Sequence, residues 1–449
     1  LAFQGERDRF RSSQTAAELQ TALAGRIEEF SSIETVERAM IQAGLAGEEI
    51  LFDPSLAAVP ALSSSLQDLL REARCEPTAV FIHLKTAGDV IRSLAAVQAF
   101  KRTQPVGARI IFITQRPYGE LASLATQIDQ VVEVEPGQAA VAGLPRPLIA
   151  ANFGGDPVAC ALLRSLRAVW AIGYGEEKGV IALRDDRSPE LARHLAAVRN
   201  HMNRYHLYFA MLGLPASSSP PELRVKRAEQ DYGVAQFGAG SGERVWAAKR
   251  VDPETVGDAL RRAGGRWLAV GAPDEAASAR AAGVPDADNL CGRTSWAELA
   301  GVLAGARCYV GQDSGPTHLA AALGVPVLAL FGFTSPILNA PVGPRVALLQ
   351  SDLACAFRGC RVACPELECT RRYTAEVIAQ ALAHLGATSD AQRLDTAAAI
   401  AHAGFRLVPP DHAVEDRNPF LDVLRAEPRT GIPNDPALAL AREWVEHAE

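Results

Sequence analysis

The chain has 449 residues, of which 48% are hydrophobic and 22% are charged. This length exceeds what one hydrophobic core usually organises, so we expect two main domains with extensions. The formal net charge of −7 argues against a broad nucleic-acid-binding surface. No apolar run approaches the ~20 residues of a membrane span, and the first residues lack a signal-peptide pattern, so we expect a cytoplasmic protein.

Residues 1–77 carry helical periodicity, with apolar side chains three and four positions apart. Pro54, Pro60 and the serines at 63–65 interrupt it. We therefore predict a helical N-terminal extension over 1–77.

From Thr78 the pattern changes to strands alternating with helices, which is typical of a parallel sheet with right-handed crossovers. We predict a Rossmann-like acceptor-side domain over 78–218, ended by the Ser- and Pro-rich linker at 216–221. Its expected strands are 79–84, 108–114, 131–134, 148–151 and 168–174, and its expected helices are 90–101, 118–128, 158–166 and 191–212.

The alternation resumes over 219–385, which we predict to be a second Rossmann-like domain. Its expected strands include 232–237, 267–270 and 325–331, and its expected helices include 253–263, 296–304 and 375–385. Residues 386–449 form a predicted C-terminal tail with helices at 391–403 and 436–447.

The stretch from Cys308 to Pro336 reads as a strand, a tight polar turn, a short helix and a second, fully apolar strand. Asp313 and Ser314 are expected to supply N-cap side chains, with the helix beginning near Pro316. Such a turn directs backbone N–H groups and the positive end of the helix dipole at one spot, which favours a phosphate. An ordinary capped helix start in an α/β protein is the alternative.

The longer string decides between these readings: Asp313-Ser314-Gly315-Pro316-x-His318-Leu319-Ala320-Ala321-Ala322-Leu323-Gly324-x-Pro326, then Ala329-Leu330-Phe331-Gly332-x-Thr334-Ser335-Pro336. It closely resembles the nucleotide-sugar signature of the family nine glycosyltransferases, which are the bacterial heptosyltransferases and their relatives. The resemblance covers roughly residues 79–385. It implies a GT-B architecture, in which two Rossmann-like domains face each other across a cleft, and catalysis without a metal.

Asp89 follows the first predicted strand in the turn Lys85-Thr86-Ala87-Gly88-Asp89. An N-cap role would explain an aspartate at this position. In the resembling family, the aspartate of this Gly-Asp pair is the proposed catalytic base. We predict that Asp89 is the base of a single, inverting displacement.

The resemblance also assigns donor-binding residues. The helix start over Ser314, Gly315, Pro316, Thr317 and His318 would bind phosphates through its free N–H groups, although a buried, satisfied histidine is the plain alternative for His318. Lys249 lines up with the family's Lys-Arg-Trp-Pro, but Val251-Asp252 replaces the Trp-Pro, so Arg244 is a second candidate cation. Glu275, after Asp274, matches an acidic position near the ribose, or is a solvated helix-start carboxylate. Asp313 would hold donor sugar hydroxyls or cap its helix.

Four of the eight cysteines cluster as Cys355-x4-Cys360-x3-Cys364-Pro365-x3-Cys369. A disulfide framework is not expected in the cytoplasm, and four thiolates suggest structural zinc or iron. The cluster resembles that of the subfamily that heptosylates autotransporter proteins, whose members bind iron there, whereas other relatives carry cysteines there apparently without metal. The acidic pair Asp286 and Asp288 has metal-ligand spacing, but we interpret it as loop acid.

The sequence therefore predicts a transferase that moves a sugar, heptose by resemblance, from a nucleotide-diphosphate donor such as ADP-heptose. The acceptor would be a hydroxyl of a lipopolysaccharide-core glycolipid or of a protein. Peripheral contact with the inner membrane and homo-oligomerisation stay open, and no nucleic-acid partner is expected. The alternative to an enzyme is a non-catalytic protein that binds a nucleotide or a nucleotide sugar. The sequence does not name the sugar, the base or the acceptor.

Overall fold

The protein is described here by a computed structural model. It describes residues 78–103, 108–177, 179–185, 192, 203–214, 217, 219–226, 230–238, 249–353 and 367–408. The extension predicted over 1–77 and the tail beyond residue 408 lie outside these residues.

The first domain is a six-stranded sheet in the order β3-β2-β1-β4-β5-β6. All neighbouring strands are parallel except β6, which runs antiparallel to β5. Its elements are β1 (Thr78–His83), α5 (Ala87–Thr103), β2 (Arg109–Gln115), η2 (Arg116–Tyr118), α6 (Gly119–Ser123), β3 (Gln130–Val134), β4 (Ile149–Asn152), α7 (Pro157–Ser165), β5 (Trp170–Glu177), β6 (Val180–Asp185) and α9 (Arg204–Met211).

The second domain is a six-stranded sheet in the order β12-β11-β10-β9-β7-β8, with β12 antiparallel to β11 at its edge. The other neighbouring strands are parallel. Its elements are β7 (Tyr232–Ala235), α11 (Pro253–Ala263), β8 (Arg266–Ala269), η3 (Pro273–Glu275), α12 (Ala276–Ala281), α13 (Trp296–Gly305), β9 (Cys308–Gln312), α14 (Gly315–Ala322), β10 (Val327–Phe331), α15 (Pro336–Asn339), β11 (Val346–Ser351), α17 (Glu368–Arg371), α18 (Ala375–Gly386), α19 (Asp390–His402) and β12 (Phe405–Val408).

Several helices begin where the sequence places a capping side chain. Asp156 accepts from the backbone N–H groups of residues 158 and 159 at the start of α7, and Asp252 accepts from Thr255 N at the start of α11. At α13, Ser295 and Glu298 form a reciprocal capping box. These caps satisfy N–H groups that have no partner within the helix, which fixes where each helix starts.

The central strands are buried on both faces, and alternate residues enter different cores. On β1, Ala79 and Phe81 pack with α5, whereas Val80 and Ile82 pack with α7. The cluster on the α5 side continues into the second domain, where it includes Leu319 of α14. The two domains therefore share one apolar core, in addition to the separate core on the far face of the second sheet.

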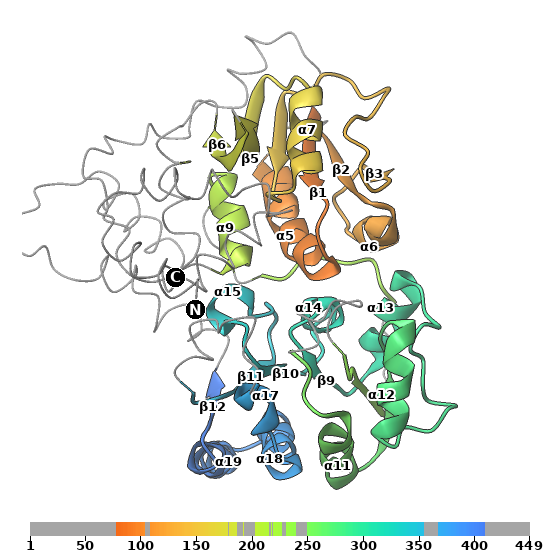
Figure 1. Ribbon diagram of the computed structural model, residues 1–449, viewed down its shortest axis with the longest axis vertical. Helices are drawn as coiled ribbons and strands as arrows, with labels where there is room; N and C mark the ends of the chain where they lie inside the picture. The colour runs from red at the N-terminus through yellow and green to blue at the C-terminus, as the bar shows by residue number, and fades with distance from the viewer. Residues whose placement is uncertain are drawn as a thin grey trace, which may run out of the picture.

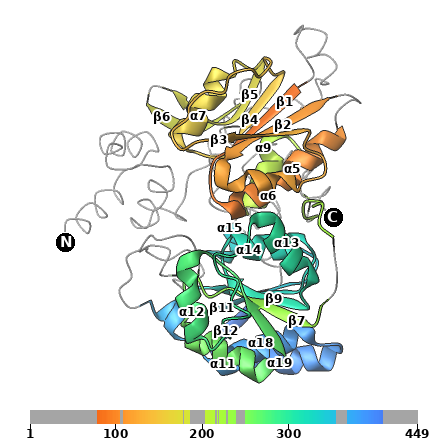
Figure 2. The same ribbon diagram turned by 90° about the vertical axis from the view of Figure 1, so that its right-hand side faces the viewer.

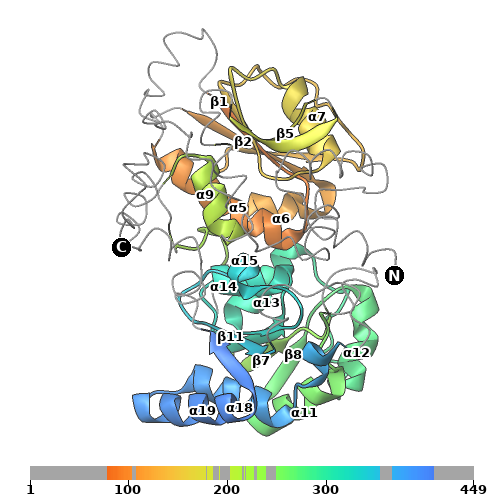
Figure 3. The same cartoon turned by 60° about the vertical axis from the view of Figure 1, so that its left-hand side comes forward.

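Three helices of the first domain, α5, α6 and α9, lie toward the second domain, where α13, α14 and α15 face them (Figures 1 and 3). Figure 2 shows the same stacking with the two sheets above and below this helical layer. The layer between the domains is thus built from helices that follow strands of both sheets.

The α/β class and the two wound domains are confirmed, with corrections of detail. Each sheet carries one antiparallel edge strand, β6 or β12, that was not predicted from the sequence. The helix expected over 118–128 is shorter and spans only Gly119–Ser123. Residues after the predicted 218/219 boundary still bind the first domain, since Gln98 exchanges two 2.8 Å hydrogen bonds with the backbone of Glu222.

None of the helices in the described residues combines the length and apolar character of a membrane span.

Candidate functional site

Each sheet has a point where its strand order reverses, and several of the predicted site residues follow strands at these points. In the first sheet the reversal lies between β1 and β4, and in the second between β7 and β9. Open α/β sheets bind ligands beyond the carboxyl ends of such strands. Asp89 follows β1, and Asp313 and Ser314 follow β9.

Asp89 lies in the first turn of α5 and keeps a partly exposed side chain. Its Oδ2 accepts from Thr86 Oγ1 at 2.9 Å, and its Oδ1 accepts from Arg92 Nη2 at 2.5 Å. Burial alone would raise its pKa, but the charges of Arg92 and Lys85 and the Thr86 hydroxyl hold the pKa of Asp89 well below its usual range. The carboxylate is ionised at neutral pH and is available to accept a proton.

The α14 turn differs from the expected cap. The helix begins at Gly315, and neither Asp313 nor Ser314 caps it through a side chain. Ser314 Oγ instead donates to Gln236 Oε1 at 2.5 Å. The Ser314 hydroxyl does not cap the helix because it binds the side-chain amide of Gln236, the residue that follows β7. Ser314 and Gly315 are half-buried, so the start of α14 is accessible.

A buried charged group lies behind this turn. Lys249 Nζ donates to Asp313 Oδ2 at 2.9 Å and to the Asp313 carbonyl at 3.1 Å. His318 Nε2 lies 3.7 Å from Asp313 Oδ1. Burial would raise the pKa of Asp313, but Lys249 and His318 hold it low. Burial lowers the pKa of His318, so its imidazole is neutral at neutral pH.

Glu275 is only 2% exposed and receives hydrogen bonds from Gln236 Nε2 at 3.2 and 3.4 Å. Burial raises its pKa from 4.5 to about 7, with Gln236 opposing the shift. The hydroxyl of Tyr309 also donates to Gln236 Oε1, at 3.0 Å. Gln236 thus connects the carboxyl group of Glu275 with the hydroxyl of Ser314 through the two ends of one amide.

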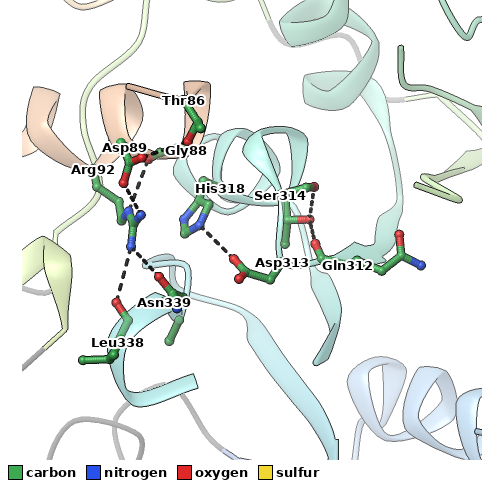
Figure 4. Close-up of polar contacts among 12 residues, drawn as sticks. Thr86, Gly88, Asp89, Arg92, Gln312, Asp313, Ser314, His318, Leu338 and Asn339 are labelled. Atoms are coloured by element: carbon green, nitrogen blue, oxygen red, sulfur yellow. Dashed lines mark hydrogen bonds and ion pairs between the residues drawn. The ribbon is translucent and has the colours of Figure 1, made fainter. Parts of the chain in front are cut away.

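The starts of α5 and α14 touch each other across the domain boundary (Figure 4). A Cβ atom on Gly88 would lie 2.9 Å from His318 Cδ2, and one on Gly315 would lie 2.8 Å from Ala87 Cβ. Only glycine permits this approach of two helix N-termini. The turn that precedes the predicted base therefore packs directly against the predicted phosphate turn.

Some predicted residues fall outside the described part of the chain: Arg244, Cys355, Cys360 and Cys364. Cys369 is buried in a small cluster with Phe333, so the metal prediction for the four cysteines stays a prediction. Among the described residues, no three His, Cys, Asp or Glu side chains gather where they could hold a metal ion. Asp288, of the acidic pair, accepts from Arg266 Nη2 at 2.6 Å.

Three contributors to the site were not predicted from the sequence. Gln236 organises the turn side, Arg92 binds Asp89, and Glu120 reaches across the boundary to Ser295 Oγ at 2.9 Å and Trp296 N at 2.8 Å. The i,i+3 spacing of Asp89 and Arg92 is a signal that could have revealed their pairing. The other two contacts join distant segments, and nothing local in the sequence indicates them.

Comparison with known proteins finds a matching family and similar solved structures. Residues 155–361 match the model of glycosyltransferase family 9 (heptosyltransferase). The matched segment spans less than half of the chain. That region includes Lys249, Glu275 and the complete α14 turn, whereas Asp89 precedes it.

Relatives of this chain include lipopolysaccharide heptosyltransferase 1 of Pseudomonas aeruginosa, which is 44% identical over 102 residues. This match spans 23% of the chain and 27% of that relative, about a quarter of its length. Among solved structures, ADP-heptose lipopolysaccharide heptosyltransferase II of E. coli aligns over 69% of this chain and 98% of its own, at 16% identity and a TM-score of 0.51. The fold of the two wound domains is thus GT-B.

Proposed function

We propose that the chain is a glycosyltransferase that moves a sugar from a nucleotide-diphosphate donor to an acceptor hydroxyl with inversion. Heptose carried on ADP is the donor we favour, because the matched family and the P. aeruginosa relative are described as heptosyltransferases. The observation that carries the proposal is the contact between the Asp89 turn and the α14 turn.

The donor side of the reaction belongs to the second domain. The departing diphosphate needs hydrogen-bond donors and positive charge, and the first turn of α14 offers backbone N–H groups at the positive end of a helix dipole. Lys249 lies beside this turn and adds a cation. The neutral imidazole of His318 lines the same turn and would contact phosphate or sugar oxygens. The carboxylate of Asp313 would accept hydrogen bonds from hydroxyl groups of the donor sugar.

Glu275 is assigned to the ribose. A carboxylate can accept hydrogen bonds from both ribose hydroxyls, and Gln236 holds this one in a fixed orientation. Gln236 also binds Ser314. A nucleotide sugar whose ribose contacts Glu275 and whose diphosphate contacts the α14 turn would therefore bind to one hydrogen-bonded network.

The acceptor side belongs to Asp89. In a single in-line displacement, the acceptor hydroxyl loses its proton as it attacks the anomeric carbon opposite the diphosphate. Asp89 is ionised, partly exposed and directed at the domain boundary, so it can accept that proton. The acceptor is a hydroxyl of the lipopolysaccharide core, met at the cytoplasmic face of the inner membrane, or a protein hydroxyl.

The test is transfer of heptose from ADP-heptose by the full chain, offered core glycolipid and protein acceptors separately. The wild type is expected to transfer to one of them, and Asp89→Asn is expected to bind ADP normally while losing about 10²–10⁴-fold in kcat. A chain that binds ADP but neither transfers nor hydrolyses the donor is a binding protein, and that result would remove the proposal.

The choice of nucleotide is tested separately. A ligand that binds only the folded state raises the melting temperature, so a thermal-shift panel of nucleoside diphosphates and nucleotide sugars ranks the donors. We expect ADP compounds to give the largest shift. A larger shift with another base would replace ADP in the proposal without changing the reaction.

A further inference from the structure

Arg92 is a buried arginine that connects Asp89 with the second domain. It lies one turn after Asp89 in α5, and only 7% of it is exposed. Its Nη2 donates to Asp89 Oδ1 at 2.5 Å, and its Nε donates to the Gly88 carbonyl at 3.3 Å. Its Nη1 donates in the other direction, to the Leu338 carbonyl and to Asn339 Oδ1, both at 3.3 Å (Figure 4).

The two acceptors of Nη1 belong to α15, which follows β10 in the second domain. These contacts exist only while the domains are packed together. Other polar contacts also cross the boundary, including Asn203 Nδ2 to the Ala340 carbonyl at 3.3 Å and Glu120 to the start of α13. Neither of those contacts involves Asp89, so Arg92 differs from them in binding the predicted base and the opposite domain at once.

Asp89 is surrounded by titratable and charged groups from several elements. They are His83 and Lys85 at the end of β1, Arg92 on α5, Tyr118 on η2, Tyr208 on α9 and His318 on α14. Among those that lower the pKa of Asp89, Arg92 contributes most, against burial, which raises it. The imidazole of His83 is neutral at neutral pH, because burial lowers its pKa to about 3.

We propose that Arg92 is a positioning residue that links domain closure to the exposure of the Asp89 carboxylate. In the packed arrangement, α15 holds Nη1, so a single nitrogen, Nη2, binds Asp89 and only Oδ1 is engaged by the guanidinium. Oδ2 then has the Thr86 hydroxyl as its partner and is not covered by the guanidinium, so it can take the proton of the sugar-accepting hydroxyl. When the domains part, Nη1 loses both acceptors.

The free fork of a guanidinium binds a carboxylate through two parallel hydrogen bonds. After the domains separate, Nη1 can join Nη2 on Asp89 and cover both oxygens. A carboxylate covered in this way is a weaker base, because the ion pair stabilises its charged form. Closure onto α15 therefore removes one hydrogen-bond donor, Nη1, from Asp89 at the stage when the nucleotide sugar is bound. This inference rests on the proposed role of Asp89 as the base.

The first measurement does not depend on activity. Full chain labelled with ¹³C in its aspartate carboxyl groups is titrated by NMR, and the Asp89 signal is assigned by its loss in Asp89→Asn. We expect Arg92→Met to raise the Asp89 pKa by about one to three units. Glu120→Gln, which weakens a different contact between the domains, is the matched control and should leave that pKa unchanged. An unmoved pKa in Arg92→Met would overturn the inference.

The second measurement uses Arg92→Lys and Asn339→Ala. Lysine keeps the positive charge, but its single ammonium cannot span Asp89 and α15, and Asn339→Ala removes one of the two acceptors of Nη1. We expect both variants to keep a low Asp89 pKa and the wild-type KM for the donor, with kcat about three- to tenfold lower. Wild-type kcat in both would overturn the link to closure. An inactive wild type would instead refute the proposed function, and the NMR result would still report on the ion pair.

Discussion

Glu275→Gln tests the electrostatics of the site without an assay of transfer. The carboxyl group is 2% exposed, and burial raises its pKa from 4.5 to about 7. At 1.36 kcal/mol per pKa unit, ionising it in the folded state costs about 3 kcal/mol relative to the unfolded chain. The folded state holds the extra proton between these two pKa values, so this contribution to stability falls as the pH rises from about 4.5 through 7.

Glutamine is neutral at every pH and can still accept from Gln236. We therefore expect the melting temperatures of wild type and Glu275→Gln to be close at pH 5, and the variant to be more stable by about 2 to 3 kcal/mol at pH 8.5. This corresponds to roughly 5–10 °C for a domain of this size. The exposed Glu254, on α11, provides the control substitution Glu254→Gln, which should change the melting temperature little at either pH.

The result that refutes this reasoning is a difference between wild type and Glu275→Gln that is the same at pH 5 and at pH 8.5. A second readout adds the ligand. If ribose hydroxyls donate to the Glu275 carboxylate, ADP binding near pH 6.5 must release a proton. Calorimetry in two buffers of different ionisation enthalpy measures that proton directly, and the release should vanish in Glu275→Gln.

Three further predictions follow from contacts in the site. Gly88→Ala places a Cβ 2.9 Å from an imidazole carbon of His318 on α14. We therefore expect small-angle scattering to show a more open chain, and we expect transfer to fall at least tenfold. The control Gly301→Ala, whose Cβ would have no atom within 4 Å, should instead stabilise the fold by about 0.5–1 kcal/mol. Lys249→Met leaves the buried Asp313 without its cation, and chemical denaturation should show a loss of about 3 kcal/mol that Asp313→Asn largely restores. Tyr309→Phe removes the hydroxyl bound to Gln236, and chemical denaturation should show that the free energy of unfolding falls by about 1–3 kcal/mol. No change would mean that this hydrogen bond does not contribute to the buried network around Gln236.

Much of the fold was readable from the sequence because its signals are local. The helix predicted over 253–263 matches α11, since Asp252 and Pro253 open it and Gly264, with φ of 72°, ends it. The turn after β9 was placed correctly because a buried strand, small polar residues and proline occur together. The edge strands β6 and β12 were missed because their half-exposed sequences lack a continuous apolar run, and their pairing depends on neighbours brought close by the fold.

The site was less readable, because its side chains choose partners across the structure. Ser314 has the position and chemistry of a helix cap, yet Gln236 binds its hydroxyl and replaces that role. The contact of Gly88 with His318, and the bridge from Arg92 to α15, join residues of different domains. A sequence pattern indicates which residues lie at a strand end, but the packing of the two domains decides which of them meet.

The most direct test of the account is a crystal structure of the full chain with an unreactive ADP-sugar bound. The account predicts the diphosphate at the first turn of α14, hydrogen-bonded to its backbone N–H groups and close to Lys249, with the Asp89 carboxylate facing the anomeric carbon from the other domain. A diphosphate bound elsewhere, or Asp89 directed into solvent while the domains are closed on the ligand, would contradict it.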